Sequence, residues 1–187
     1  MKQIILLLCG RPGVGKSYIS TIIAETLNRP LIIVSMNGKK NSSVFNGVEQ
    51  EVPGANVGEI LKAMSDSKHR APVILLDEFE KSDKMVQQSL GNPTDKTLNH
   101  AFKDKFFELP IPIQDIIFIG TANYPEEIEP FIASRMTVVM LKPLSYNQRM
   151  SIARKQVEAM FDRYKVSFAK SSLNDDLLKK IIGLYKE

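Results

Sequence analysis

The stretch that decides the fold is Gly10-Arg11-Pro12-Gly13-Val14-Gly15-Lys16-Ser17, which matches the pattern GxxxxGK(S/T) at every fixed position. The apolar run 4–9 comes directly before it and is typical of a buried strand. A glycine-rich turn between a strand and a helix offers several backbone N–H groups to phosphate oxygens, and the helix N-terminus adds a partial positive charge. The stretch therefore predicts a phosphate-binding loop, in which Lys16 reaches the β- and γ-phosphates and Ser17 binds Mg²⁺.

A second motif is Val73-Ile74-Leu75-Leu76-Asp77-Glu78, in which four apolar residues end in two carboxylates. This pattern predicts a buried parallel strand whose carboxyl end opens into a ligand crevice. There Asp77 would orient Mg²⁺ and its waters, and Glu78 would polarise the water that attacks the γ-phosphate. Strands often end in solvated acidic residues, so this motif indicates a nucleotide-binding site only in combination with the phosphate loop upstream.

Two further polar residues adjoin strand-like runs. Asn123 follows the run 116–120, and its amide can both donate to and accept from the attacking water or the γ-phosphate. A turn asparagine before Tyr124-Pro125 is an equally good interpretation of the spacing. Arg135 precedes the run 137–141, where it is either a surface residue or an arginine finger that reaches a neighbouring subunit's γ-phosphate.

The composition describes one α/β domain with an appendage. The chain has 187 residues, of which 43% are hydrophobic and 25% are charged. A formal charge of +4 permits a nucleic-acid or acidic partner, although a solvated basic surface is the more common cause. The single cysteine, Cys9, rules out an intrachain disulfide. No segment approaches membrane-spanning length, so we expect a soluble, cytoplasmic protein with no membrane partner.

The order and spacing of these motifs resemble those of the AAA+ ATPases. The segments GRPGVGKS, VILLDE and TAN are followed by an arginine just before the last strand. The sequences around these segments are most similar to the ATPase module of Lon-type proteases. The resemblance runs from about residue 3 to the C-terminus. Its main segments are 10–17 with the helix that follows to Asn28-Arg29-Pro30, then 54–58, 72–81, 104–110, 117–123 and 134–136.

This resemblance implies a fold and a division of the chain. The fold is an α/β P-loop NTPase, a five-stranded parallel sheet flanked by helices, with a small, truncated C-terminal helical lid. The nucleotide-binding domain is expected over 1–143 and the partial lid over 144–187. The implied activity is hydrolysis of ATP, with Mg²⁺, at the interfaces of a ring of identical subunits, and a protein is the expected partner to be remodelled.

The resemblance also implies a role for each matched residue. Asp77 and Glu78 are the Walker B pair, Asn123 is sensor one, and Arg135 is the finger that acts on a neighbouring subunit. The Walker A loop binds ATP through Gly10, Arg11, Pro12, Gly13, Val14, Gly15, Lys16 and Ser17. The catalytic residues are Glu78, Asn123, Arg135 and Lys16, and the Mg²⁺ ligands are Ser17 and Asp77.

The chain departs from the family pattern at several places. Val52 and Pro53 stand where the family's pore loop has an aromatic-aliphatic pair, and the segment 81–93 is shorter than in the family. The chain ends about where the helix with the sensor-two arginine would begin. No protease domain with a Ser-Lys pair follows, so we expect no peptidase activity. Two alternative functions stay open: a viral- or plasmid-type replication ATPase or small helicase acting on single-stranded nucleic acid, and an inactive nucleotide-binding remnant.

Overall fold

A computed structural model describes residues 3–164 of the chain. The contacts between residues divide the chain into two compact units, Met1–Lys142 and Pro143–Glu187. The end of the chain, where the sequence departs from the family pattern at the sensor-two helix, lies outside the described residues. The role of the second unit as a lid stays a prediction.

The first unit is built on a five-stranded parallel sheet, as predicted. The strand order is β2-β3-β6-β1-β7. The strands are β1 (Ile5–Cys9), β2 (Leu31–Ser35), β3 (Val73–Asp77), β6 (Ile117–Ala122) and β7 (Thr137–Met140). Strands β3 and β6 are buried along nearly their whole length, which explains why their sequences are continuously apolar and do not alternate.

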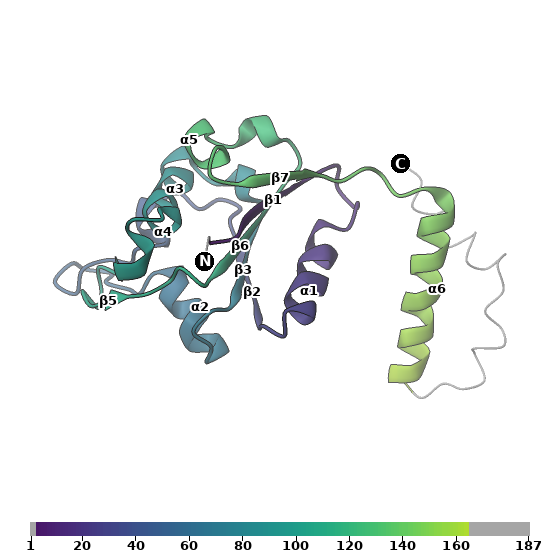
Figure 1. Cartoon of the computed structure of the whole chain (residues 1–187), viewed down its shortest axis with the longest axis horizontal. Helices are drawn as coiled ribbons and strands as arrows, with labels where there is room; N and C mark the ends of the chain where they lie inside the picture. The colour runs from purple at the N-terminus through teal and green to yellow at the C-terminus, as the bar shows by residue number, and fades with distance from the viewer. Residues whose placement is uncertain (1–2, 165–187) are drawn as a thin grey trace. The chain divides into compact units, whose positions relative to one another are not determined.

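Helices cover both faces of this sheet (Figure 1). Helix α1 (Lys16–Thr26) lies on one face, and α2 to α5 lie on the other. These four helices are α2 (Glu59–Ser67), α3 (Lys84–Ser89), α4 (Gly91–Thr94) and α5 (Pro130–Ala133). Within residues 3–164, four 3₁₀ turns connect the elements: Ser42–Val44, Phe79–Lys81, Asn99–Ala101 and Pro125–Glu127.

The two faces carry two separate apolar clusters. Because side chains alternate along a strand, Leu7 of β1 packs with Phe118 in one cluster, while Leu8 packs with Ile119 in the other. The second cluster is closed by Ala24, Ile19 and Ile23 of α1. Full burial of each large apolar side chain contributes about 1.5–3 kcal/mol, so both faces stabilise the central strands.

The sheet brings the ends of three strands together. Leu8 of β1 lies beside Thr121 of β6, and Leu76 of β3 lies beside Gly120. Since all strands are parallel, their carboxyl ends meet at one edge of the sheet. Strand β6 is longer than the run 116–120 suggested, because it continues through Thr121 and Ala122. This extension places Thr121 directly between β1 and β3.

A two-stranded antiparallel hairpin, β4 (Phe102–Lys103) and β5 (Pro110–Ile111), lies outside the main sheet and was not predicted. It is tied to the preceding loop by Asp104, whose side chain is fully buried. The Asp104 carboxylate accepts hydrogen bonds from the N–H groups of Gly58, at 2.8 Å, and Phe106, at 2.9 Å.

We expect Asp104→Ala to lower the free energy of unfolding by about 2–4 kcal/mol, because the buried N–H of Gly58 and the partly buried N–H of Phe106 lose their acceptor and each such loss costs about 1–3 kcal/mol. Urea denaturation measures this change. Asp115 is exposed, so Asp115→Ala is the matched control and should change stability by less than about 0.5 kcal/mol. Equal effects of the two substitutions would contradict the role of Asp104.

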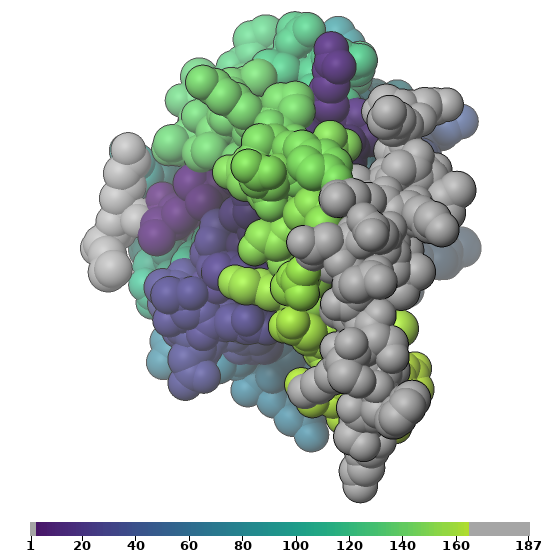
Figure 2. Space-filling model, turned by 90° about the vertical axis from the view of Figure 1, so that its right-hand side faces the viewer, coloured from purple at the N-terminus to yellow at the C-terminus, as the bar shows by residue number. Residues whose placement is uncertain are grey.

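The described part of the second unit contains helix α6 (Tyr146–Arg163). Ser145 caps its N-terminus, since its hydroxyl accepts the N–H of Gln148 while the Gln148 side chain accepts the N–H of Ser145. None of the residues of this helix is buried, and the part of it that Figure 2 leaves uncovered is seen in yellow-green. Within residues 3–164, no helix has the length and apolar character that crossing a membrane requires.

Candidate functional site

The phosphate loop follows β1 directly and is held at both sides by the sheet. The N–H of Gly10 donates to Ala122 at the end of β6, and the N–H of Leu141 donates to Cys9. A Cβ on Gly10 would lie 2.7 Å from the Leu141 carbonyl oxygen, so only glycine fits there. Gly15, with φ 92°, takes the left-handed conformation that turns the chain into α1.

The loop presents backbone donors, as phosphate binding requires. The N–H of Val14 is bonded within the loop to Arg11. Among the described residues, by contrast, no hydrogen bond is made by the N–H groups of Gly13, Gly15 and Lys16. The amides at the start of a helix have no partner within the helix. These free donors, together with the Lys16 ammonium, fit a chain of phosphates.

Lys16 is held by oxygen atoms of its own chain. Its Nζ donates to the Gly10 carbonyl at 2.7 Å, to the Asn123 Oδ1 at 2.9 Å and to the Arg11 carbonyl at 3.3 Å. All three acceptors are neutral, so the ammonium has hydrogen bonds but no counter-charge among them. An anionic phosphate oxygen offers a stronger partner, because it adds the attraction between opposite charges to the hydrogen bond.

Ser17 and Asp77 meet at the start of α1 and the end of β3. The Ser17 Oγ lies 3.5 Å from the Asp77 Oδ1, and both residues are partly or fully exposed. Mg²⁺ prefers oxygen ligands and usually takes only one or two from the protein, with phosphates and water completing its shell. This hydroxyl–carboxylate pair fits that pattern. Over the described part of the chain, no group of three or more His, Cys, Asp or Glu side chains could hold a metal ion.

Glu78 lies next to Asp77 in a left-handed backbone conformation, with φ 55° and ψ 47°. Only a few per cent of residues other than glycine adopt such a conformation, and it costs about 1–3 kcal/mol. The Glu78 carboxylate forms an ion pair with Lys81, one turn further along. The hydrogen bond from that ion pair raises the pKa of the Lys81 ammonium above its ordinary value, so Lys81 remains charged at neutral pH.

Asn123 contacts both the phosphate loop and the 3₁₀ turn that follows β3. Its side-chain oxygen accepts from Lys16, and its backbone N–H donates to Glu80 Oε1 at 3.0 Å. The other carboxylate oxygen of Glu80 is buried without a hydrogen-bond partner among the described residues. The structure therefore brings five predicted site residues to one edge of the sheet: Lys16, Ser17, Asp77, Glu78 and Asn123.

Arg135 lies at the opposite edge of the sheet. It precedes β7, whose Thr137 pairs with Leu6 near the start of β1, whereas the phosphate loop follows the end of β1. At about 3.3 Å per residue, the ends of a five-residue strand are about 13 Å apart. The Arg135 side chain therefore does not join the other site residues of its own chain.

The Arg135 guanidinium is held in place by three contacts. It donates to the Gly91 carbonyl at 2.6 Å and to Asp95 at 3.2 Å, and it lies 4.4 Å from the centre of the Phe131 ring. Hydrogen bonds from Thr97, and then the charge of Arg135, lower the pKa of the Asp95 carboxyl. The side chain of Arg135 remains 23% exposed.

Sequence reasoning gave no role to several residues that support these side chains. Lys81 pairs with Glu78, Glu80 binds the backbone of Asn123, and Asp95 binds Arg135. Thr121 contacts both members of the carboxylate pair. The three-residue spacing from Glu78 to Lys81 is a signal that could have been used, whereas the Asp95 contact joins residues 40 positions apart and left no local signal.

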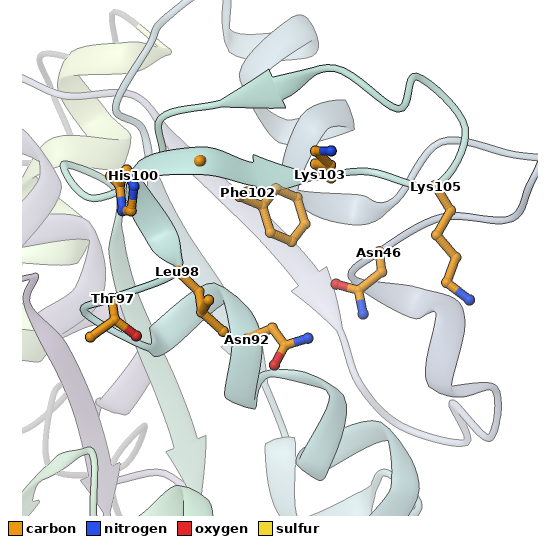
Figure 3. Close-up of a pocket in the computed structure, with 9 residues that line it drawn as sticks. Asn46, Asn92, Thr97, Leu98, His100, Phe102, Lys103 and Lys105 are labelled. Carbon is orange, nitrogen blue, oxygen red and sulfur yellow. The ribbon is translucent and has the colours of Figure 1, made fainter.

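A separate cavity of about 290 Å³ lies beside the β4–β5 hairpin (Figure 3). Its lining combines amides with two lysines and a histidine: Asn46, Asn92, Thr97, Leu98, His100, Ala101, Phe102, Lys103 and Lys105. None of the predicted site residues lines this cavity, so the carboxyl edge of the sheet remains the candidate site.

Comparison with known proteins agrees with this geometry. Residues 6–144 match the family described as "ATPase family associated with various cellular activities (AAA)". The Lon protease of Mycoplasma pneumoniae is 32% identical over 193 residues, which cover 99% of this chain and 24% of that protein. The Lon protease of Frankia alni is 30% identical over 189 residues, covering 97% of this chain and 21% of that protein. The chain thus spans about a fifth to a quarter of these relatives and matches their ATPase module alone.

Among solved structures, the chain is similar in fold to a cryo-electron microscopy reconstruction described as the closed state of Hsp104 with ATPγS and FITC casein. The TM-score is 0.72 at 18% sequence identity, and the match covers 87% of this chain and 33% of that one. At this identity the likeness concerns the fold.

Proposed function

Because this chain belongs to the AAA family of ATPases, we propose that it binds ATP with Mg²⁺ at the carboxyl edge of its sheet and hydrolyses it. The observation that carries this proposal is the convergence of Lys16, Asp77 and Asn123 on the ends of three adjacent strands. Phosphoryl transfer depends mainly on positioning and electrostatic stabilisation, and this edge supplies a cation, a metal-binding oxygen pair and a carboxylate.

ATP binding would exchange the partners of Lys16. Its ammonium leaves the carbonyls of Gly10 and Arg11 and binds the β- and γ-phosphates, while the free amides of Gly13, Gly15 and Lys16 bind the remaining phosphate oxygens. The exchange also frees the Asn123 side chain, which is then able to contact the γ-phosphate or the attacking water. Magnesium held by Ser17 and Asp77 would supply neutralisation of the charge on the phosphate oxygens.

Hydrolysis would then depend on Glu78. Its carboxylate, 39% exposed, can accept a proton from a water molecule positioned against the γ-phosphate. In the structure this carboxylate is paired with Lys81, so it must turn from Lys81 toward the water before it acts. Asn123 would hold the same water from the other side, because an amide donates and accepts at once.

The place of Arg135 supports a ring in which one subunit completes the site of the next. Arg135 lies one strand length from its own phosphate loop, so its guanidinium is available to a γ-phosphate bound by a neighbour. Asp95 and the Phe131 ring hold it in a fixed orientation. An arginine finger contributes about 10³ to 10⁵ in rate, so isolated subunits would be slow enzymes.

We expect Arg135→Ala to lower ATP turnover by about 10³-fold or more while ATP affinity changes little, since the finger acts on the transition state. Phosphate release and nucleotide titration measure the two quantities. Mixing this variant with Glu78→Gln subunits, which carry an intact finger but no base, should restore turnover. If the loss persists in the mixture, the role of Arg135 across the interface is wrong.

The partner that the proposed ring would remodel is a protein. The relatives that the chain matches are Lon proteases, and the similar Hsp104 structure is described with FITC casein. Val52, 45% exposed, lies in the loop that would face a threaded chain. Since Val52 is aliphatic, any grip there is apolar and weaker than that of an aromatic side chain.

Stimulation of turnover separates the possible partners. An unfolded protein such as casein should raise the ATPase rate, and single-stranded DNA or RNA should not. Stimulation by nucleic acid alone, with affinity that falls steeply with salt, would replace the protein partner by a nucleic acid. The match to the ATPase module alone gives no support to peptidase activity, and casein should remain intact in this assay.

A further inference from the structure

Thr121 occupies the most central position of the site. It is the fifth residue of β6, the strand between β1 and β3, and it is only 1% exposed. Its hydroxyl donates to Asp77 Oδ1 at 2.8 Å and accepts the backbone N–H of Glu78 at 2.9 Å. One side chain therefore contacts both proposed Walker B residues.

The direction of these two bonds follows from chemistry. An ionised carboxylate has no proton to give, so the hydroxyl must donate to Asp77. A hydroxyl has only one proton, and its lone pairs are then free to accept from Glu78. The bond to Asp77 fixes the rotation of that carboxylate, on the same oxygen that lies 3.5 Å from the Ser17 hydroxyl. Thr121 thus orients one of the two proposed Mg²⁺ ligands toward the other.

The bond to Glu78 acts on the backbone. Glu78 adopts a left-handed conformation that a residue with a Cβ avoids, and its N–H is anchored to Thr121. Without this anchor a partly buried donor loses its partner, and the strained backbone of Glu78 can relax toward an ordinary conformation. Any such change rotates the Cα–Cβ bond of Glu78 and moves its carboxylate away from the attacking water.

We propose that Thr121 is a positioning residue for ATP hydrolysis, whose single hydroxyl sets the Mg²⁺-binding carboxylate of Asp77 and the backbone of the general base Glu78 together. This inference rests on the proposed function. In this role Thr121 does not contact ATP. Removal of its hydroxyl therefore affects the rate of hydrolysis and the Mg²⁺ concentration that hydrolysis requires more than it affects the affinity for nucleotide.

The test compares Thr121→Val, which keeps the shape and removes the hydroxyl, with Thr121→Ser, which keeps the hydroxyl. For Thr121→Val we expect turnover to fall by about 10- to 100-fold, because misplacement of reacting groups by about 1 Å can cost 10²-fold. The Mg²⁺ concentration at half-maximal rate should rise several-fold, while the dissociation constant for ATP stays within about threefold. Thr121→Ser should restore both kinetic quantities.

The outcomes separate this inference from the proposed function. If the unchanged protein hydrolyses ATP and Thr121→Val equals it in rate and Mg²⁺ requirement, only the role of Thr121 is overturned. A rate loss in Thr121→Val without a change in Mg²⁺ requirement, or a loss that Thr121→Ser does not restore, would show a packing role and would equally overturn it. If Thr121→Val does not fold, Thr121→Ala gives the same comparison with a smaller side chain. Absence of hydrolysis in the unchanged protein would overturn both proposals.

Discussion

Lys16→Ala is expected to abolish binding of Mg·ATP at the concentrations where the unchanged protein is saturated. Each hydrogen bond between the ammonium and a phosphate oxygen contributes about 1.5–3 kcal/mol, so loss of two such bonds raises the dissociation constant by about 10² to 10⁴. The expected result is measured by titration with a fluorescent ATP analogue, with ATPase activity followed in parallel.

The substitution must be separated from simple loss of the loop structure, because Lys16 also bonds to Gly10 and Asn123. Lys62 is an exposed lysine on α2, and Lys62→Ala is therefore the matched control. Thermal denaturation should show all three proteins folded. Unaltered nucleotide affinity in a folded Lys16→Ala protein would show that the phosphate loop does not bind ATP.

Glu78→Gln is expected to retain ATP binding and to lose turnover by about 10² to 10⁴, the usual contribution of a general base. Glutamine keeps the size and shape of the side chain but cannot accept the proton of the attacking water. The ion pair with Lys81 is also lost, yet both side chains are about 40% exposed, so stability should change little. Single-turnover hydrolysis and equilibrium binding of ATP separate the two effects.

Glu127 offers the matched control for this substitution, since it is exposed near the same edge of the sheet and makes no side-chain hydrogen bond among the described residues. Glu127→Gln should behave as the unchanged protein. Normal turnover in Glu78→Gln would show that another group, or no group, acts as the base.

The fold and the main site could be predicted because their signals are local. The loop 10–17 and the strand that ends at Asp77 each combine an apolar run with a short polar pattern, and parallel strands must bring such ends together. The resemblance to AAA+ ATPases, and to the Lon ATPase module, is confirmed by the family match over residues 6–144 and by the Lon relatives. The roles of the individual residues stay predictions.

What could not be predicted depends on contacts between distant residues. Thr121 looks like an ordinary β-branched strand residue in the sequence, and only the register of β6 beside β3 shows that its hydroxyl meets Asp77. The contact from Asp95 to Arg135 likewise joins two loops. Spacing alone left Arg135 undecided between a surface residue and a finger, and its role stays a prediction.

The central claim is that ATP is hydrolysed between subunits of this protein. The measurement that tests it most directly is steady-state phosphate release from Mg·ATP over a wide range of protein concentration. We predict a specific activity that is low in dilute protein and rises with concentration, as Arg135 of one subunit meets the nucleotide of the next. A specific activity near zero at every concentration would contradict hydrolysis itself, and a constant non-zero value would contradict a site shared between subunits.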